Sequence, residues 1–296
     1  MAEITAALVK ELRDITGAGM MECKKALVET EGNIEEAVDF LRTRGLASLA
    51  KKAGRATNEG AIASFVSDDS KTGVLIEVNC ETDFVGTNAV FTRFVADLAH
   101  IVAQAAPVDS AALQQCAFLE RGITVEEVFG EVAGKLGENM TISRFVRHEI
   151  AGTGALATYI HGGARIGIMV AYAFEKQETA SNVAFTTYAR DVAMQVAAAD
   201  PIAVAREDFE AAVVDHELGI YKAQAAESGK PEQIQEKMAQ GRLQKFFKEQ
   251  ALVEQAFVKD PDISIGELTA RTSKEVGDTI SITSFVRYNL GETNSE

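Results

Sequence analysis

The sequence predicts an α+β protein in which an N-terminal helical bundle precedes two copies of one core module with antiparallel sheets. Three observations support this prediction: three short helical patterns near the N-terminus, a segment pattern that occurs twice, and a polar helical insertion in the second copy. We expect the bundle at 1–53, the first core module at 54–150, the second at 151–290 with its insertion at about 201–250, and a polar tail at 291–296.

Apolar residues at helical spacing predict three helices in the N-terminal bundle. Thr5 and Asn33 are the expected N-caps of the first and third helices, and Gly45 follows the last turn of the third. Such a bundle is similar to the ubiquitin-associated kind, and its core is so small that some apolar side chains must stay near the surface. Met20 and Met21 are candidates for this surface, although one of the two could equally fill the core.

The core modules follow from an internal duplication. A shift of 94 positions overlays 60–107 on 154–201, and a shift of 140 positions overlays 123–147 on 263–287. Because the shift grows from 94 to 140 positions, the second copy must hold about 46 additional residues. Each copy has the order strand, turn, strand, helix, helix, strand, and this order predicts antiparallel sheets covered by helices.

The additional residues predict an antiparallel helical hairpin that projects as an arm. Two long helical patterns flank the segment 228–231, where glycine and proline together make a sharp turn. Three apolar residues of one helix are expected to face three of the other: Phe209, Val213 and Ile220 facing Ile234, Met238 and Leu243. Such an arm could dimerise, contact a partner or be a passive elaboration, and we favour an interaction.

Charge and composition exclude several classes of function. The net charge of −15 argues against direct contact with nucleic acid, because binding phosphates needs a basic surface. No apolar run is long enough to span a bilayer, and the N-terminus lacks a signal-peptide pattern, so we predict a cytoplasmic protein without membrane contact. The basic run 51–55 is interpreted as a solvated linker. Scattered cysteines and histidines predict no disulfide framework, no metal site and no cofactor.

The main candidate for function is the stretch of Thr82, Asp83, Phe84 and Val85. It lies in a turn between an apolar strand and a long apolar-periodic helix, where chains usually present functional groups. The shift of 94 positions places it opposite 176–179, which is a wholly polar turn. The module therefore does not require Phe84 in its core, and we predict an exposed aromatic anchor for a partner.

Catalytic motifs are absent from the sequence, which has no phosphate-binding glycine loop, dinucleotide fingerprint or nucleophile elbow. Glu77, Glu81 and Asp83 form a carboxylate cluster that a hydrolase could use, but in so acidic a chain we interpret them as solvated. His161 is a lone histidine in a hairpin turn, where a structural role or contact with a partner is favoured over catalysis. We therefore predict that the chain is not an enzyme.

Five short segments carry a family resemblance: Val9 to Arg13, Thr16 to Met21, Cys23 to Leu27, Glu77 to Val85 and His161 to Gly167. Together they closely resemble the bacterial translation elongation factor Ts family, and the resemblance extends from the first residues to about Leu290. The family exchanges guanine nucleotides on the GTPase elongation factor Tu. It binds the GDP-loaded GTPase, promotes GDP release and leaves when GTP binds.

The resemblance implies roles for the residues of the candidate turn. Asp83 and Phe84 would intrude beside the nucleotide site of elongation factor Tu, and Thr82 and Val85 would bind the partner with them. They would displace the elements that hold Mg²⁺ there and loosen the grip on the phosphates. The ion would belong to the GTPase, so this chain needs no metal of its own.

The resemblance also implies a wider interface. Leu12, Met20 and Met21 would dock on the GTPase domain, and the second core module, with His161 as its candidate residue, would grip another domain. The arm resembles the coiled-coil arm of the family and could form a homodimer or a 2:2 complex. Some members have a further C-terminal helix, whereas this sequence ends in the polar residues 291–296, so the bundle is expected to contribute more of the docking. An adaptor that acts through its bundle is the alternative.

Overall fold

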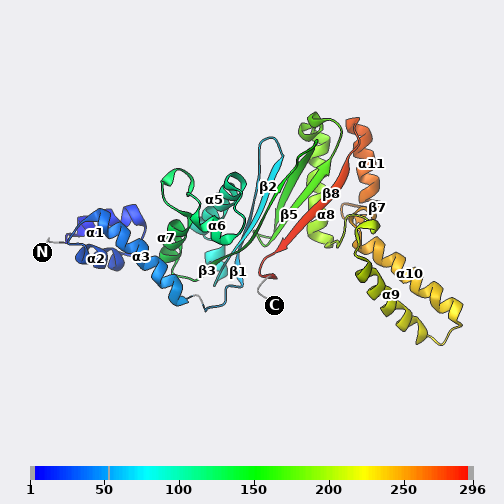
Figure 1. Cartoon of the computed structure of the whole chain (residues 1–296), viewed down its shortest axis with the longest axis horizontal. Helices are drawn as coiled ribbons and strands as arrows, with labels where there is room; N and C mark the ends of the chain where they lie inside the picture. The colour runs from blue at the N-terminus through cyan, green and yellow to red at the C-terminus, as the bar shows by residue number, and fades with distance from the viewer. Residues whose placement is uncertain (1–3, 53, 293–296) are drawn as a thin grey trace.

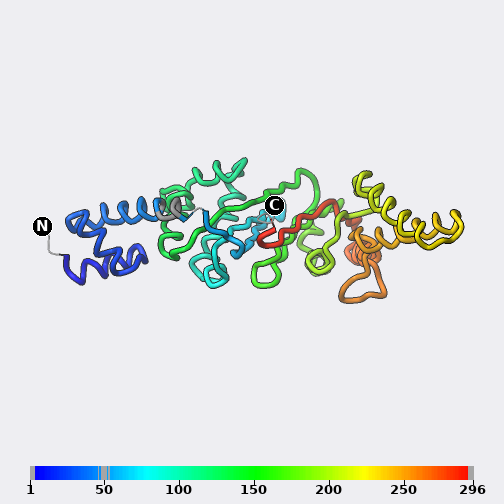
Figure 2. The backbone as a smooth tube through the Cα atoms, turned by 90° about the horizontal axis from the view of Figure 1, so that it is seen from below, coloured from blue at the N-terminus to red at the C-terminus, as the bar shows by residue number. Residues whose placement is uncertain are grey.

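The chain forms an elongated molecule, with the N-terminal bundle at one end, a helical hairpin at the other and two sheets between them (Figure 1). The same order of parts is seen from below (Figure 2). This computed structural model describes residues 4–52 and 54–292. Its combination of helices with antiparallel sheets confirms the predicted α+β class.

Three helices form the bundle, as the sequence predicted: α1 (Ala6–Thr16), α2 (Met20–Glu29) and α3 (Ile34–Lys52). Both predicted N-caps are confirmed. The Thr5 hydroxyl accepts a hydrogen bond from the Leu8 N–H, and the Asn33 side chain accepts one from the Glu35 N–H. Among the described side chains, the small apolar core of the bundle contains Val9, Leu12, Cys23, Ala26, Leu27 and Ala37.

The first core module consists, in chain order, of β1 (Glu59–Val66), β2 (Thr72–Cys80), α4 (Asp83–Gly86), α5 (Ala89–Ala105), α6 (Ser110–Gln115), the 3-10 turn η1 (Leu119–Arg121), α7 (Val125–Leu136) and β3 (Met140–Glu149). Its strands pair antiparallel in the order β1-β2-β3. The long helix α5 packs on β1 and β2 and buries one face of the sheet. The strand β2 is buried along almost its whole length, including the apolar residues Val74 to Ile76 and the polar residues Glu77 and Asn79.

The second core module repeats this order with an insertion: β4 (Gly154–His161), β5 (Ile166–Ala173), η2 (Gln177–Ser181), α8 (Val183–Ala199), η3 (Arg206–Asp208), α9 (Ala211–Ala226), α10 (Glu232–Gln250), η4 (Leu252–Glu254), β6 (Ala256–Phe257), β7 (Asp260–Ser264), α11 (Ile265–Val276) and β8 (Ser281–Asn289). Its main sheet has the order β4-β5-β8. The bulge at Glu77 in the first sheet recurs at Ala171, its counterpart at the shift of 94. The predicted duplication is therefore present in the structure.

The two main sheets pack against each other through a shared apolar cluster that includes Ile62 and Leu156. Two backbone hydrogen bonds tie the modules together. The Ile62 N–H donates to the Ala164 carbonyl at 2.9 Å, and the Leu156 N–H donates to the Ser70 carbonyl at 2.8 Å. Because Leu156 and Ala164 are the duplicates of Ile62 and Ser70, each module makes the same contact with the other.

The third bundle helix continues past Gly45 to Lys52, so its predicted end was wrong. Gly45 lies inside α3 against α7, where a Cβ atom would come within 2.5 Å of the Gly130 carbonyl oxygen. This glycine therefore permits a close approach of two helices and does not end one. Within the basic run 51–55, the Lys52 ammonium donates to the Gly137 carbonyl at 2.6 Å, so the linker prediction was also wrong at that residue.

The inserted hairpin of α9 and α10 confirms the predicted arm, but two of its predicted contacts were wrong. Ile220 and Ile234 are exposed, whereas the packed residues are Phe209, Val213, Val214, Leu218, Tyr221, Leu243, Phe246 and Phe247. On α9 the inward side follows Val214, Leu218 and Tyr221, which are spaced by four and three residues. Ile220 lies about 100° of helical rotation from Tyr221, and this offset places it outside the contact.

Candidate functional site

The predicted turn is a one-turn helix, α4, which begins at Asp83 shortly after β2. The Thr82 hydroxyl caps this helix, accepting a hydrogen bond from the Val85 N–H at 3.4 Å. Asp83 and Phe84 are exposed, and Phe84 retains 84% of its accessible surface. Val85 is buried in the core of the first module, so the expectation that it contacts a partner directly is corrected to a supporting role.

The backbone of α4 is held at both ends. At its start, the Cys80 thiol donates to the Thr82 carbonyl at 3.1 Å. At its end, a Cβ atom on Gly86 would come within 2.8 Å of the Gly60 carbonyl oxygen, so the chain seats directly on β1. Burial raises the pKa of the Cys80 thiol to about 12, and this group therefore stays protonated and is no nucleophile. An aromatic side chain on such a fixed backbone is a preorganised contact group.

A carboxylate that the sequence did not single out also holds α4. Glu138, between α7 and β3, accepts hydrogen bonds from the backbone N–H groups of Glu81 and Thr82 at 3.1 and 3.0 Å. Its other oxygen accepts a bond from the Thr82 hydroxyl at 2.6 Å. The only signal for this residue in the sequence is that the shift of 140 places it opposite another acidic residue, Asp278.

The second core module has the same carboxylate clamp. Asp278 accepts hydrogen bonds from the N–H groups of Glu175 and Lys176 at 3.1 and 3.0 Å. It also accepts one from the Thr179 hydroxyl at 2.6 Å. The bond from Thr179, followed by those from the two backbone groups, lowers the pKa of Asp278 to about 2. The clamp is therefore part of the shared module architecture.

What the two clamps hold is different. At the shift of 94, buried Val85 corresponds to buried Thr179, and exposed Phe84 corresponds to exposed Glu178. One position of the turn faces inward and the next faces solvent in both modules. The first module presents an aromatic ring at the solvent-facing position, and the second presents a charge.

Residues 81–292 match the protein family described as Elongation factor TS. Over 289 residues the chain is 47% identical to Elongation factor Ts of Clostridium perfringens (strain SM101 / Type A), covering 98% of this chain and 93% of that protein. It is 45% identical to that of Clostridium novyi (strain NT) over 290 residues, with the same coverage. It is 43% identical to that of Nitratidesulfovibrio vulgaris (strain DP4), with 98% of this chain and 96% of that protein covered.

The chain belongs to the elongation factor Ts family. Membership supports a role in translation elongation as a nucleotide exchange factor. The five segments that carried the resemblance in the sequence lie in the bundle, in and after β2, and at the tip of the β4–β5 hairpin. Across 4–52 and 54–292, no helix of this family member combines the length and the apolar character needed to cross a membrane.

The acidic cluster of this elongation factor Ts family member is not a solvated one. Glu77 is fully buried, and its carboxylate lies 2.8 Å from Arg144 Nε. It also accepts hydrogen bonds from Asn79 Nδ2 at 3.1 Å and from the Gly291 N–H at 2.8 Å. The Asn139 N–H, with a further contribution from Arg55, lowers the pKa of Glu81.

These contacts correct the prediction that all three carboxylates are solvated and weaken the hydrolase alternative. Glu77 links the first sheet to the end of β8, because it accepts the N–H of Gly291, which follows that strand. Glu81 accepts the Asn139 N–H at 2.6 Å at the start of β3. Of the three, Asp83 alone is exposed, so the group does not face a common substrate site.

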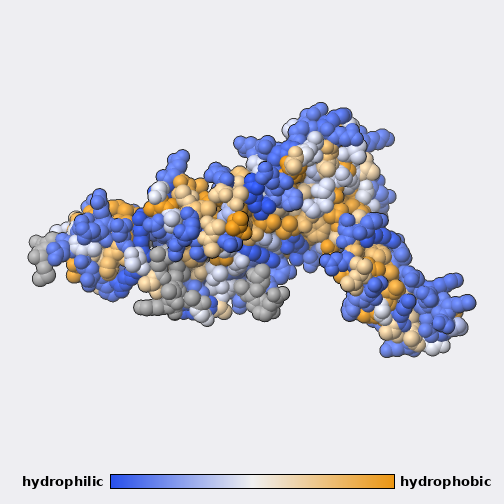
Figure 3. All heavy atoms as spheres, viewed as in Figure 1, coloured by the Kyte–Doolittle hydropathy of each residue, from blue (hydrophilic) through white to orange (hydrophobic). Residues whose placement is uncertain are grey.

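The bundle exposes Met20 and Met21 but buries Leu12. Met20 and Met21 are 44% and 66% exposed, so neither fills the core. Leu12 is fully buried there, and its predicted docking role is corrected to one of supporting the bundle. Ile15, near the end of α1, is also exposed, at 59%. Figure 3 shows apolar surface over the bundle among hydrophilic residues.

His161 lies exposed at the tip of the β4–β5 hairpin, where its Nδ1 is 2.9 Å from the Tyr159 hydroxyl. The same tip reaches the first core module, because Arg165 forms an ion pair with Glu59 at 2.6 Å. Glu59 precedes Gly60, on which α4 seats. The structure therefore brings the hairpin of His161 and the helix of Phe84 to the same end of β1.

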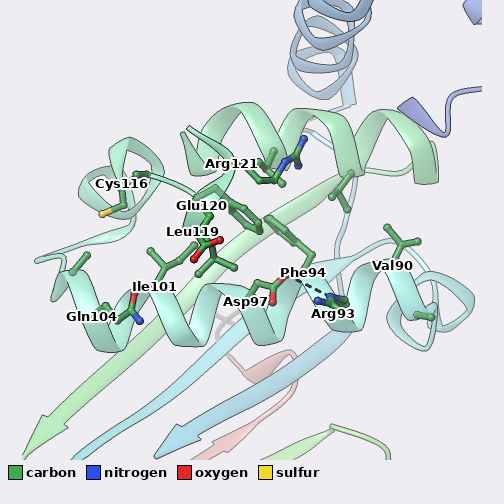
Figure 4. A pocket seen from close by; sticks show the side chains of 16 residues that line it. Val90, Arg93, Phe94, Asp97, Ile101, Gln104, Cys116, Leu119, Glu120 and Arg121 are labelled. Carbon is green, nitrogen blue, oxygen red and sulfur yellow. Dashed lines mark ion pairs between the residues drawn. The ribbon is translucent and has the colours of Figure 1, made fainter. Parts of the chain in front are cut away.

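An open groove of about 1130 Å³ runs between α5 and α7 of the first module (Figure 4). Apolar side chains of both helices line it, among them Phe94, Ile101 and Val128. Its lining begins at Ala89, two residues after α4 ends at its C-cap Thr87. In the second module, the β6–β7 hairpin covers α8, the counterpart of α5. The Lys259 ammonium of this hairpin lies 2.6 Å from the Asp191 carboxylate of α8, and the Val258 N–H donates to the Gln195 side chain.

Proposed function

We propose that this chain is the guanine nucleotide exchange factor of the GTPase elongation factor Tu. It binds the GDP-loaded GTPase, promotes the release of GDP and leaves when GTP binds. The observation that carries this proposal is the exposed ring of Phe84, next to the exposed carboxylate of Asp83, on a helix whose backbone is fixed at both ends. Family membership supports the choice of partner.

The chemistry of the turn suits the displacement of a metal ion on the partner. Mg²⁺ that bridges the phosphates is a main source of nucleotide affinity in GTPases. A bulky ring and a negative charge that intrude beside the ion displace the groups that hold it. Phe84 supplies the ring and Asp83 the charge, while Thr82 and Val85 hold the helix from which both project.

The proposed action makes and breaks no covalent bond on this chain, so the chain is not an enzyme in the bond-making sense. It is a negative coupling between two ligands of one GTPase. If the factor weakens nucleotide affinity by a given ratio, the nucleotide weakens the affinity of the factor by the same ratio. The cellular excess of GTP then sets the direction of exchange.

Two further surfaces complete the proposed interface. Met20 and Met21 dock on the GTPase domain, and methionine suits such adaptable contacts. The hairpin tip at His161 contacts another domain of the partner.

The exposed Ile220 and Ile234 on the arm provide the surface for a homodimer or a 2:2 complex. Sedimentation of the chain alone and of its complex with elongation factor Tu would measure the oligomeric state.

The decisive test is a pull-down of elongation factor Tu with and without GDP, followed by stopped-flow release of a fluorescent GDP. We expect capture that added GDP weakens, and faster release in the presence of the chain. Unchanged release would overturn the proposal. Deleting residues 1–53 separates it from an adaptor: an exchange factor keeps weakened exchange through its core modules, whereas an adaptor loses its activity entirely.

A further inference from the structure

We propose that Glu138 is a positioning residue for nucleotide exchange, holding α4 so that Asp83 and Phe84 meet the partner in one fixed orientation. This inference rests on the proposed function and extends it to a residue 54 positions away from Phe84 in the sequence. Glu138 itself is half-buried, and its carboxylate receives its bonds from the residues immediately before α4. It acts through those residues and not through contact with the nucleotide.

The helix α4 depends on contacts outside itself. A helix of four residues cannot hold its own geometry, because nucleating the first turn is unfavourable without outside contacts. Its final residues are seated on β1 through Gly86 and Val85. Its N-terminal end, which carries Asp83, depends on Thr82 and on the hydrogen bonds that fix Thr82.

The Glu138 carboxylate is chemically suited to hold the residues before α4. Three donors converge on Glu138, namely two backbone N–H groups and one hydroxyl, and a carboxylate is the side chain that can accept all three without offering a donor of its own. Bonds to a charged acceptor are also stronger than neutral ones. The Thr82 hydroxyl donates to Glu138 while it accepts from the Val85 N–H, so the carboxylate fixes the rotamer of the cap.

Glu138 is itself anchored through its neighbour Asn139. The next residue, Asn139, donates its backbone N–H to the Glu81 carboxylate at 2.6 Å and its side chain to the Arg55 carbonyl at 3.0 Å. The Glu81 N–H returns a bond to Glu138 at 3.1 Å. Hydrogen bonds therefore run in both directions between the end of β2 and the start of β3, and they hold the backbone around Glu138 in place.

The second core module supplies a matched control. Asp278 makes the same three kinds of bond around a turn that presents Glu178 in place of Phe84. Loss of either carboxylate removes two bonds from backbone N–H groups at equivalent positions and one bond from a hydroxyl, which belongs to Thr82 in the first module and to Thr179, the counterpart of Val85, in the second. Only the loss of Glu138 alters the orientation of the aromatic anchor.

The experiment compares E138Q, E138D and D278N with the unmodified full-length chain. Stopped-flow release of a fluorescent GDP from elongation factor Tu gives the rate, thermal unfolding gives the stability, and amide hydrogen exchange at 81–87 without the GTPase gives the order of α4. We expect E138Q to slow stimulated release roughly tenfold, the size of effect that follows from losing a hydrogen bond to a charged group. We expect E138D, which keeps the charge, to recover part of the rate.

Amide exchange at 81–87 should speed up in E138Q and stay unchanged in D278N. D278N should lower the unfolding temperature as much as E138Q while leaving GDP release within about twofold of the unmodified chain, since distant sites act independently. The triple variant E138Q/D83A/F84A should release GDP as slowly as D83A/F84A, because the clamp then has neither contact group left to position.

Three results would overturn the inference: equal slowing by D278N and E138Q, a triple variant E138Q/D83A/F84A roughly tenfold slower than D83A/F84A, or unchanged amide exchange at 81–87 in E138Q. If E138Q does not fold, E138D is judged by the same criteria. If the unmodified chain itself fails to stimulate release, the proposed function is wrong, and the amide exchange still decides whether Glu138 orders α4.

Discussion

Phe84 and Glu178 occupy equivalent positions in the two core modules, and both side chains are exposed. The architecture therefore accepts a charge where the first module has an aromatic ring, and the ring is free to serve a partner. We expect F84A to slow stimulated GDP release roughly 30-fold, the loss that a buried aromatic anchor of about 2 kcal/mol produces at an interface. Stopped-flow release from elongation factor Tu measures it.

The matched control for F84A is E178A, which truncates the equivalent exposed residue in the second module. Neither variant should shift the thermal unfolding midpoint, because both side chains lie in solvent. E178A should leave GDP release unchanged. An equal effect of the two variants on release would show that Phe84 is not a specific anchor.

The exposure of Phe84 was predictable because the chain contains its own control, the polar turn of the second copy. The role of Glu138 was not, since it lies 56 residues from Thr82 in the sequence and only the folded sheet brings the two together. Hydrophobic spacing predicted the helices of the arm but not the orientation of Ile220. Neighbouring positions on a helix differ in direction by about 100°. Because the segment has several apolar residues, their spacing alone does not decide which of them face the other helix.

The error at Leu12 has a different cause. A resemblance transfers the role of a whole segment, and it does not separate the residues that touch a partner from those that hold the segment together. Leu12 and Met21 both belong to resembling segments, but one is fully buried and the other is 66% exposed. Exposure in the folded bundle decides between the two roles.

Leu12 and Met21 should therefore respond oppositely to truncation. We expect L12A to destabilise the bundle by about 3 kcal/mol, because it leaves a cavity in a small core. We expect M21A to change stability by less than about 0.5 kcal/mol and to weaken binding of elongation factor Tu by about 1 kcal/mol. Calorimetric unfolding and titration of the GTPase measure the two quantities, and a stable L12A variant with weak binding would reverse the assignment.

Gly45 should be sensitive to the addition of a single methyl group. In G45A the new Cβ atom would lie 2.5 Å from the Gly130 carbonyl oxygen, so α3 must move away from α7. We expect a loss of about 1–3 kcal/mol in the free energy of unfolding. The control is G219A in α9, where nothing lies within 4 Å of the added atom, and there the gain in helix propensity should stabilise the chain by up to about 1 kcal/mol. Stabilisation by both variants would contradict the close contact.

The buried pair of Glu77 and Arg144 should matter far more than an exposed one. E77Q removes the buried carboxylate that is paired with the Arg144 guanidinium over the Tyr288 ring and leaves that guanidinium with the exposed Glu292, so we expect a loss of about 3 kcal/mol in stability. E249Q removes a similar pair with Lys245 on the exposed surface of the arm, where the expected loss is below about 0.5 kcal/mol. Urea unfolding at neutral pH gives both values, and equal losses would show that burial of Glu77 has little energetic effect.

The clamp of the second module should make the free energy of unfolding depend on pH in the acidic range. Hydrogen bonds from Thr179 and the turn backbone lower the pKa of Asp278 to about 2 in the folded chain, below its value near 3.9 when unfolded. A carboxylate whose pKa falls on folding stabilises the fold above the unfolded pKa and loses that contribution as the pH falls through the folded pKa. The contribution of Asp278 should therefore be complete above about pH 4 and decline between about pH 4 and pH 2.

We expect the difference in unfolding free energy between the unmodified chain and D278N to be constant at neutral pH and to shrink steadily through this acidic range. T179V removes the largest cause of the lowered pKa, so it should raise the pKa of Asp278 and narrow the range over which stability changes. Urea unfolding from pH 7 downwards, with a carboxyl-carbon titration of Asp278, measures both effects. A difference that stays constant to the acid limit would mean that the clamp does not favour the ionised carboxylate, and its bonds would then stabilise the turn by geometry alone.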